Sequence, residues 1–146
     1  MAVLIETLEV IRQKDGLLFD ALGPSDLARL NELLVRHALP RMPRGYVAFL
    51  SQSDGMCWNG IYLHGAVRRR LAPSGYHMPG LVEAAKDAAE CGLPSGWLLL
   101  GAGDDDIYVY NGMKDTYHIA DMTDHMPISS FNDFADLLAC IIDERI

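Results

Sequence analysis

The chain has 146 residues, of which half are apolar and 22% are charged. This length and composition predict a single folded domain over residues 1–146 rather than a disordered chain. No apolar run approaches the ~20 residues of a membrane-spanning helix, and residues 1–22 lack the pattern of a signal peptide. Three widely spaced cysteines, Cys57, Cys91 and Cys140, match no metal-ligand pattern. We therefore expect a cytoplasmic protein with free thiols.

The net charge of −8 is concentrated in the last third of the chain. Residues 1–100 contain ten acidic and ten basic residues, whereas residues 101–146 contain ten acidic residues and only Lys114 and Arg145 as bases. Such an acidic segment argues against nucleic acid as a partner, because nucleic-acid binders present a basic patch. It favours a basic protein partner, although a merely solubilising surface has the same composition.

Three helices are predicted in the first 55 residues. The first covers residues 2–14, where Leu4, Leu8 and Ile11 share one face. The second begins at the N-cap Ser25 and ends before Pro40. A third, short helix follows Pro43 and closes with a turn at Asp54-Gly55. Its apolar face has helical spacing and consists of Tyr46, Phe49 and Leu50.

The middle of the chain changes to strand-forming residues bounded by glycine and proline. A strand is expected around 59–64, and 66–71 is a candidate for its partner. Loops are expected at Pro73-Ser74-Gly75 and Pro79-Gly80. An alanine-rich helix is predicted over 81–91 with Gly92 as its stop, followed by a buried strand at 97–101.

Asn111-Gly112 predicts a hairpin with a type I′ turn, joining strands at 106–110 and 113–119. These strands and the one at 97–101 would form a three-stranded meander. A last helix is predicted with Ser130 as its N-cap and an apolar face of Phe131, Phe134, Leu138, Ile141 and Ile142. The element order indicates an α+β fold, with a mainly antiparallel central sheet packed by N-terminal helices, one inserted helix and a C-terminal helix.

The segment 43–55 resembles the N-terminal signature of the SUKH superfamily, a group of immunity proteins related in fold to a yeast cell-wall-synthesis regulator. The matching residues are Pro43, Tyr46, Phe49, Leu50, Asp54 and Gly55. Residues 101–110 resemble a second family block, and residues 130–134 resemble the start of the final family helix. The resemblance spans about residues 25–142 in element order, whereas the arginine run Arg68 to Arg70 lies outside it.

The resemblance implies a non-catalytic immunity protein that binds and neutralises a cognate bacterial toxin domain. Because the last third is acidic, a basic nuclease is the expected kind of toxin, and steric occlusion the expected mechanism. The aspartates would steer the partner and nearby tyrosines would supply anchoring contacts. The expected partner-binding residues are Asp104, Asp105, Asp106, Tyr108, Tyr110, Asp121 and Asp124. No cofactor or metal is expected.

Two other functions remain open at the level of sequence. A small metal-dependent enzyme could use Asp104 to Asp106 with His118, Asp121 and His125, although this spacing matches no known ligand motif. A regulatory protein-interaction domain would share the fold but lack a toxin partner. Cys57 has no signature of a catalytic nucleophile around it, and Gly101-Ala102-Gly103 precedes three acids that would repel phosphate.

Overall fold

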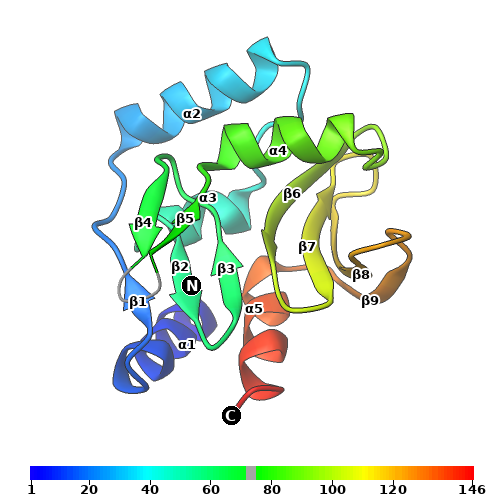
Figure 1. Cartoon of the computed structure of the whole chain (residues 1–146). Helices are drawn as coiled ribbons and strands as arrows, with labels where there is room; N and C mark the ends of the chain where they lie inside the picture. The colour runs from blue at the N-terminus through cyan, green and yellow to red at the C-terminus, as the bar shows by residue number, and fades with distance from the viewer. Residues whose placement is uncertain (72–74) are drawn as a thin grey trace.

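A computed structural model describes residues 1–71 and 75–146 of the chain (Figure 1). The N-terminal half contains α1 (Ala2–Gln13), β1 (Leu17–Leu18), α2 (Pro24–Arg36), α3 (Arg44–Leu50), β2 (Met56–Trp58) and β3 (Ile61–Leu63). It is followed by β4 (Arg69–Leu71), β5 (Tyr76–Met78) and α4 (Leu81–Glu90). The last third contains β6 (Trp97–Ala102), β7 (Asp106–Asn111), β8 (Thr116–Asp121), β9 (Pro127–Phe131) and α5 (Phe134–Asp143).

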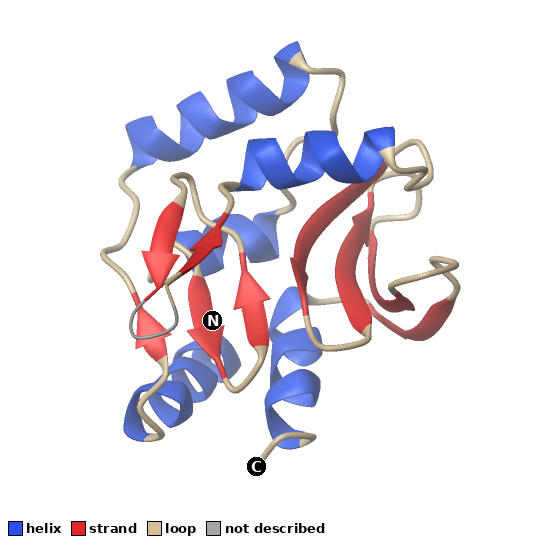
Figure 2. Cartoon of the chain, in the orientation of Figure 1, coloured by secondary structure: helices blue, strands red, loops and turns tan. Residues whose placement is uncertain are grey.

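The fold is α+β, as the element order predicted. Seven strands form an antiparallel sheet in the order β1-β2-β3-β6-β7-β8-β9, and β4 and β5 form a separate two-stranded sheet (Figure 2). The expected meander of β6, β7 and β8 is confirmed, with an irregular register between Leu99 and Gly101. Among the described residues, no helix is long and apolar enough to cross a membrane.

The main core contains buried side chains from the sheet and from all five helices. The rings of Tyr46, Phe49 and Phe134 meet there with centroids 5.1–5.5 Å apart, and all three side chains are buried. Side chains alternate between the faces of a strand, so Tyr108 of β7 joins this core while Ile107 and Val109 face the other way. The second face forms a smaller cluster beside the end of α4.

Several predicted elements occur with shifted boundaries. The helices expected at 2–14 and 81–91 correspond to α1 and α4, and Gly92 has the positive φ of 100° that ends α4. The helix after Pro43 is α3, and its predicted apolar face is fully buried. The expected loop at Pro73-Ser74 lies outside the described residues.

The prediction of a type I′ turn at Asn111-Gly112 is wrong. The strands pair Asn111 with Thr116 across a longer connection, in which the Asn111 side chain accepts the Met113 N–H at 3.0 Å. The required pair of positive φ angles occurs instead at Asn59 (47°) and Gly60 (82°). This second Asn-Gly pair is the two-residue turn between β2 and β3, so the segment 59–64, expected to be a single strand, contains this turn and β3.

Two further boundaries are corrected. Ser130 and Phe131 belong to strand β9, which pairs with β8, and α5 has Asp133 as its N-cap. Phe131 is therefore an edge-strand residue and not part of the helix. The segment 66–71 does not pair with β3: its β4 portion pairs with β5.

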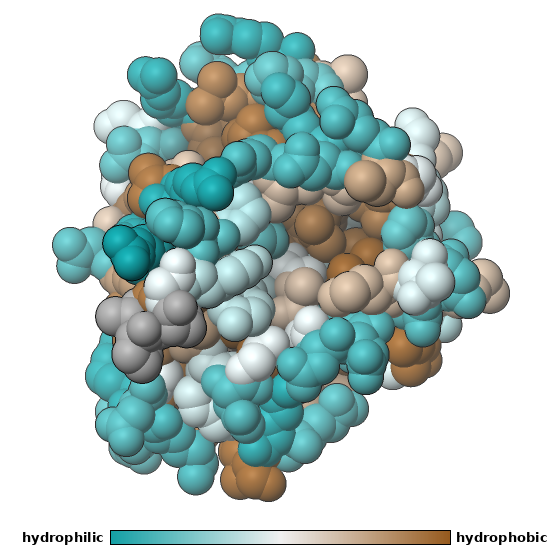
Figure 3. All heavy atoms as spheres, viewed as in Figure 1, coloured by the Kyte–Doolittle hydropathy of each residue, from teal (hydrophilic) through white to brown (hydrophobic). Residues whose placement is uncertain are grey.

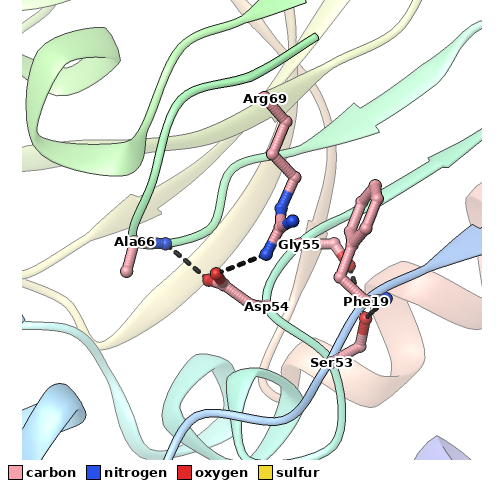
Figure 4. A network of polar contacts seen from close by, with 6 residues as sticks. All are labelled: Phe19, Ser53, Asp54, Gly55, Ala66 and Arg69. Atoms are coloured by element: carbon pink, nitrogen blue, oxygen red, sulfur yellow. Dashed lines mark hydrogen bonds and ion pairs between the residues drawn. The ribbon is translucent and has the colours of Figure 1, made fainter. Parts of the chain in front are cut away.

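The buried carboxylate of Asp54 ties the end of the α3 segment to the chain after β3 (Figure 4). Asp54 Oδ1 accepts the Ala66 N–H at 2.6 Å, and Oδ2 lies 2.8 Å from an Arg69 guanidinium nitrogen. The guanidinium also stacks 4.1 Å above the Phe19 ring. A Cβ at Gly65 would overlap the carboxylate, so this close approach requires glycine. Arg69, from the arginine run, is therefore a structural residue.

Tyr46 and His64 make a second buried polar connection nearby. The Tyr46 hydroxyl lies 2.5 Å from the His64 carbonyl and 3.1 Å from the Leu100 carbonyl, so it joins α3 to β3 and β6. His64 is 6% exposed, and its Nδ1 lies 2.9 Å from the Pro79 carbonyl. Burial lowers the pKa of the His64 imidazole, which favours the neutral ring with its proton on Nδ1.

Replacing Asp54 with alanine should strongly destabilise the fold. Asp54→Ala leaves the Arg69 guanidinium and the Ala66 N–H without their buried partner, a change expected to cost about 2–4 kcal/mol. Urea unfolding of the variant measures this cost. Glu83→Gln is the matched control, because the Arg68–Glu83 pair is exposed and should be worth less than about 1 kcal/mol. Equal losses for both variants would contradict the structural role of Asp54.

Mild acidification should also destabilise the fold through His64. Its pKa is lowered in the folded state, so the unfolded chain binds the proton more readily. The stability that the neutral His64 ring contributes is fully present above about pH 6.5 and is lost as the pH falls through the folded pKa. His118, whose pKa burial also lowers, acts in the same direction. Between about pH 7.5 and 5.5, urea unfolding should show a smaller loss of stability for His64→Asn than for the parent or for His37→Asn. An equal loss of stability in all three would contradict His64 as the origin of the pH dependence.

Candidate functional site

The structure brings the two acidic segments together at one end of the sheet. Asp104 to Asp106 form the turn into β7, and Asp121 ends β8, directly opposite Asp106 in the strand register. The Met122 N–H donates to the Asp105 carbonyl at 3.1 Å and joins the two turns. We call the set of Asp104, Asp105, Asp106, Asp121 and Asp124 the acidic edge.

Arg145 partly neutralises this edge. Its guanidinium donates to the Asn59 carbonyl at 3.0 Å and lies 3.2 Å from the Asp104 carboxylate. Asn59 returns a hydrogen bond from its amide to the Arg145 carbonyl at 3.2 Å. Arg145, one of the two basic residues in the last third of the chain, therefore links the end of α5 to the β2–β3 turn.

The aspartates of the edge differ in exposure and role. The Asp104 side chain is 72% exposed, whereas Asp106 is half-buried and its Oδ1 has no hydrogen-bond partner among the described residues. Burial raises the pKa of the Asp106 carboxyl, and the positive charge of Arg145 opposes this rise. Asp105 is exposed, and among the described residues its side chain makes no hydrogen bond or ion pair.

Asp121 and Asp124 shape the turn between β8 and β9. Asp121 Oδ1 accepts the N–H groups of Thr123 at 2.7 Å and Asp124 at 3.1 Å. These hydrogen bonds lower the pKa of the Asp121 carboxyl. Asp124 Oδ1 accepts the Met126 N–H at 2.9 Å. Both carboxylates therefore accept main-chain hydrogen bonds that fix the turn.

The two tyrosines do not have the exposure expected of anchors. Tyr108 is 1% exposed, lies in the main core, and has its hydroxyl beside Asp106 and Arg145. Tyr110 is 9% exposed, and its hydroxyl donates to Asp115 at 2.8 Å in the wall of a groove of about 760 Å³. The two rings were expected to supply anchoring contacts, but both are buried on the core face of the sheet and offer little surface to a partner.

The exposed apolar contacts come from residues that the sequence patterns missed. Met122, Met126 and Ile128 are 42%, 62% and 63% exposed, and all lie on or beside the β8–β9 turn. We call these three residues the apolar patch. Exposed methionine and isoleucine interleaved with Asp121 and Asp124 form a surface with apolar contacts and a charged rim, which is typical of protein interfaces. The β8–β9 hairpin brings these three residues to one end of the sheet. The sequence patterns did not predict this hairpin.

The opposite face of the sheet is only partly covered. Figure 3 shows a hollowed apolar area below α4, over the β6–β7 strands. Trp97, Leu99 and Ala102 are partly buried against the cluster on this face. The surface over α2 and α4 in the same view is mainly hydrophilic.

The histidines of the metal hypothesis are not gathered into a ligand set. His118 stacks on Trp97 with ring centroids 5.7 Å apart, and its ring nitrogens lie 2.9 Å from Thr116 Oγ1 and 2.8 Å from Ser130 Oγ. Among the residues the structure describes, no group of three or more His, Cys, Asp or Glu side chains could hold a metal ion. The position of His118 is thus explained by packing and hydroxyl contacts.

Comparison with protein-family models gives no match to this chain, and comparison with curated proteins gives none either. The functional interpretation therefore rests on the geometry of the acidic edge and the apolar patch and on the resemblance of the 43–55 segment.

Removing Arg145 should change both the charge and the order of the acidic edge. Arg145→Gln is expected to raise the pKa of the Asp106 carboxyl further, because the guanidinium favours its charged form. The lost contacts to Asn59 and Asp104 should cost about 1 kcal/mol. Carboxyl-carbon NMR titration measures the pKa, with Arg12→Gln, in an exposed pair with Glu9, as control. An unchanged Asp106 titration would show that Arg145 does not act on this carboxylate.

Proposed function

We propose that this chain is a non-catalytic binding protein that recognises a basic protein through the acidic edge and the apolar patch. The observation that carries this proposal is the juxtaposition of two acidic turns with three exposed large apolar side chains. Apolar side chains supply contact area, while surrounding charges increase the rate of encounter and select the sign of the partner.

The resemblance of the 43–55 segment to the SUKH superfamily supports a more specific proposal. We infer that the partner is a cognate bacterial toxin domain and that the chain is its cytoplasmic immunity protein. A basic nuclease fits best, because the acidic edge would occupy the surface with which such an enzyme holds the phosphate backbone. Neutralisation would follow from steric occlusion. A regulatory interaction domain is the second candidate, supported by the same surface without a toxin as its partner.

The signature residues lie apart from the proposed binding surface. Tyr46, Phe49, Leu50 and Asp54 are buried, and Asp54 is bound to Arg69 and Ala66. These residues maintain the fold, so the specificity of a SUKH-like protein would reside in exposed residues elsewhere. In this chain the β8–β9 turn and the turn before β7 provide such residues.

Reversing the charge of Asp105 should slow association with the partner. The partner is first captured from a lysate of the source cells with the tagged chain and identified by mass spectrometry. Asp105 is exposed, and Asp105→Lys removes no side-chain hydrogen bond or ion pair among the described residues, so it chiefly tests charge. At low salt the association rate should fall about tenfold or more, with little change in the dissociation rate.

Two further variants complete this test. Glu32→Lys makes the same charge change at an exposed site on α2 and should leave association nearly unchanged. The double variant Met126→Ser, Ile128→Ser should mainly increase the dissociation rate, because it removes apolar contact area. A captured protein that is not basic, or rates that are equal for Asp105→Lys and Glu32→Lys, would refute the acidic edge as the docking surface.

A further inference from the structure

The sheet has two edges, and they differ in how well they are protected. At one edge β1 has only two residues, a length that offers little to a pairing strand. At the other edge β9 has five residues and, within the described chain, pairs with β8 alone. Natural proteins normally protect such an edge with charges, an interior proline or a covering element.

β9 has an irregular register against β8, between Ile119 and Ala120, which is one protecting device, but within the strand itself it carries little further protection. Its sequence, Pro-Ile-Ser-Ser-Phe over Pro127–Phe131, contains no charge, and its proline is the first residue. Pro127, Ile128 and Ser130 are exposed. Because ladder hydrogen bonds alternate in an antiparallel pair, some main-chain groups of β9 point away from β8.

The pairing identifies Ser130 as the outward-facing residue. His118 and Ser130 are directly opposite, and their side chains approach to 2.8 Å between Nδ1 and Oγ. The Met122 N–H donates to the Asp105 carbonyl and so points toward β7; because main-chain directions alternate along a strand, the main chain of His118 also points toward β7 and exchanges no hydrogen bonds with Ser130. The N–H and C=O of Ser130 therefore face away from β8, where another strand would bind.

The charges around β9 select the occupant of this edge. Asp121 and Asp124 precede the strand, and Asp133 and Asp136 follow it. Antiparallel pairing with a second copy would place the acids before β9 in one chain near those after β9 in the other, and like charges would repel. An extended segment carrying lysine or arginine would instead meet acidic side chains at both ends of the strand.

We propose that β9 binds an extended, basic segment of the partner protein by strand addition, with the Ser130 N–H and C=O forming main-chain hydrogen bonds to it. This inference rests on the proposed function in taking the partner to be basic. It adds the mode of recognition: main-chain pairing would supply binding energy, and the apolar patch, which shares Ile128 with β9, would contact alternate side chains of the added strand.

A capped heptapeptide of alternating lysine and valine tests the proposal on the full chain. Its binding should slow hydrogen exchange of the Ser130 amide about tenfold or more and shift the β9 resonances in NMR spectra. The same peptide with a fully N-methylated main chain keeps the charges but has no N–H donors, and should give no protection. A peptide with glutamate in place of lysine should not bind.

The remaining outcomes separate the two proposals. Equal effects of the lysine peptide and its N-methylated form, both weakened by Asp105→Lys, would overturn strand addition while leaving charge recognition intact. Protection of Ser130 that is insensitive to Asp105→Lys would support strand addition and count against the acidic edge. Failure of the lysine peptide to protect Ser130 would overturn strand addition. Concentration-dependent protection of Ser130 by the chain alone would overturn the proposed occupant, because a second copy and not a basic segment would then pair with β9.

Discussion

The buried ion pair between Asp54 and Arg69 is the constraint on which the arrangement of the first half of the chain depends. A carboxylate that is nearly removed from water needs hydrogen bonds and an opposite charge, and Ala66 and Arg69 supply them. The interactions of the Asp54 carboxylate fix the path from β3 to β4 and place the Arg69 guanidinium over the ring of Phe19, just before α2. Three segments distant in sequence are thereby held at one point, and the Tyr46 hydroxyl connects this point to β6 in the centre of the sheet.

The packing of the helices against the sheet also determines which side chains are exposed. The short helix α3 and the core rings of α5 cover one face of the sheet, so the tyrosines of β7 are buried and their neighbours in the acidic turns remain exposed. Charge, exposed methionines and the edge strand of the sheet then occur within one hairpin, β8–β9. The proposed binding surface therefore consists of residues that lie outside the hydrophobic core.

The sequence predicted those elements whose signals are local. Helical spacing identified the buried face of α3, and glycine marked the end of α4. The type I′ turn was assigned to the wrong Asn-Gly pair, because the dipeptide alone does not show whether the flanking residues pair at two-residue separation, as Trp58 and Ile61 do. Ser130 has the residue type of a helix cap, but pairing with His118 places it in a strand. The acidic residues were visible in the sequence, whereas their meeting with Met126 and Ile128 depends on strand register.

The contact between Asn59 and Arg145 also has a consequence for folding. The two residues are 86 positions apart, so closing this contact requires most of the chain to be in place. Contacts of such long sequence separation form late and slow the folding of a sheet protein. During synthesis the acidic turn before β7 emerges well before Arg145 and stays without its counter-charge until the end of α5 is made. The acidic edge therefore acquires its final arrangement only after the last helix has docked.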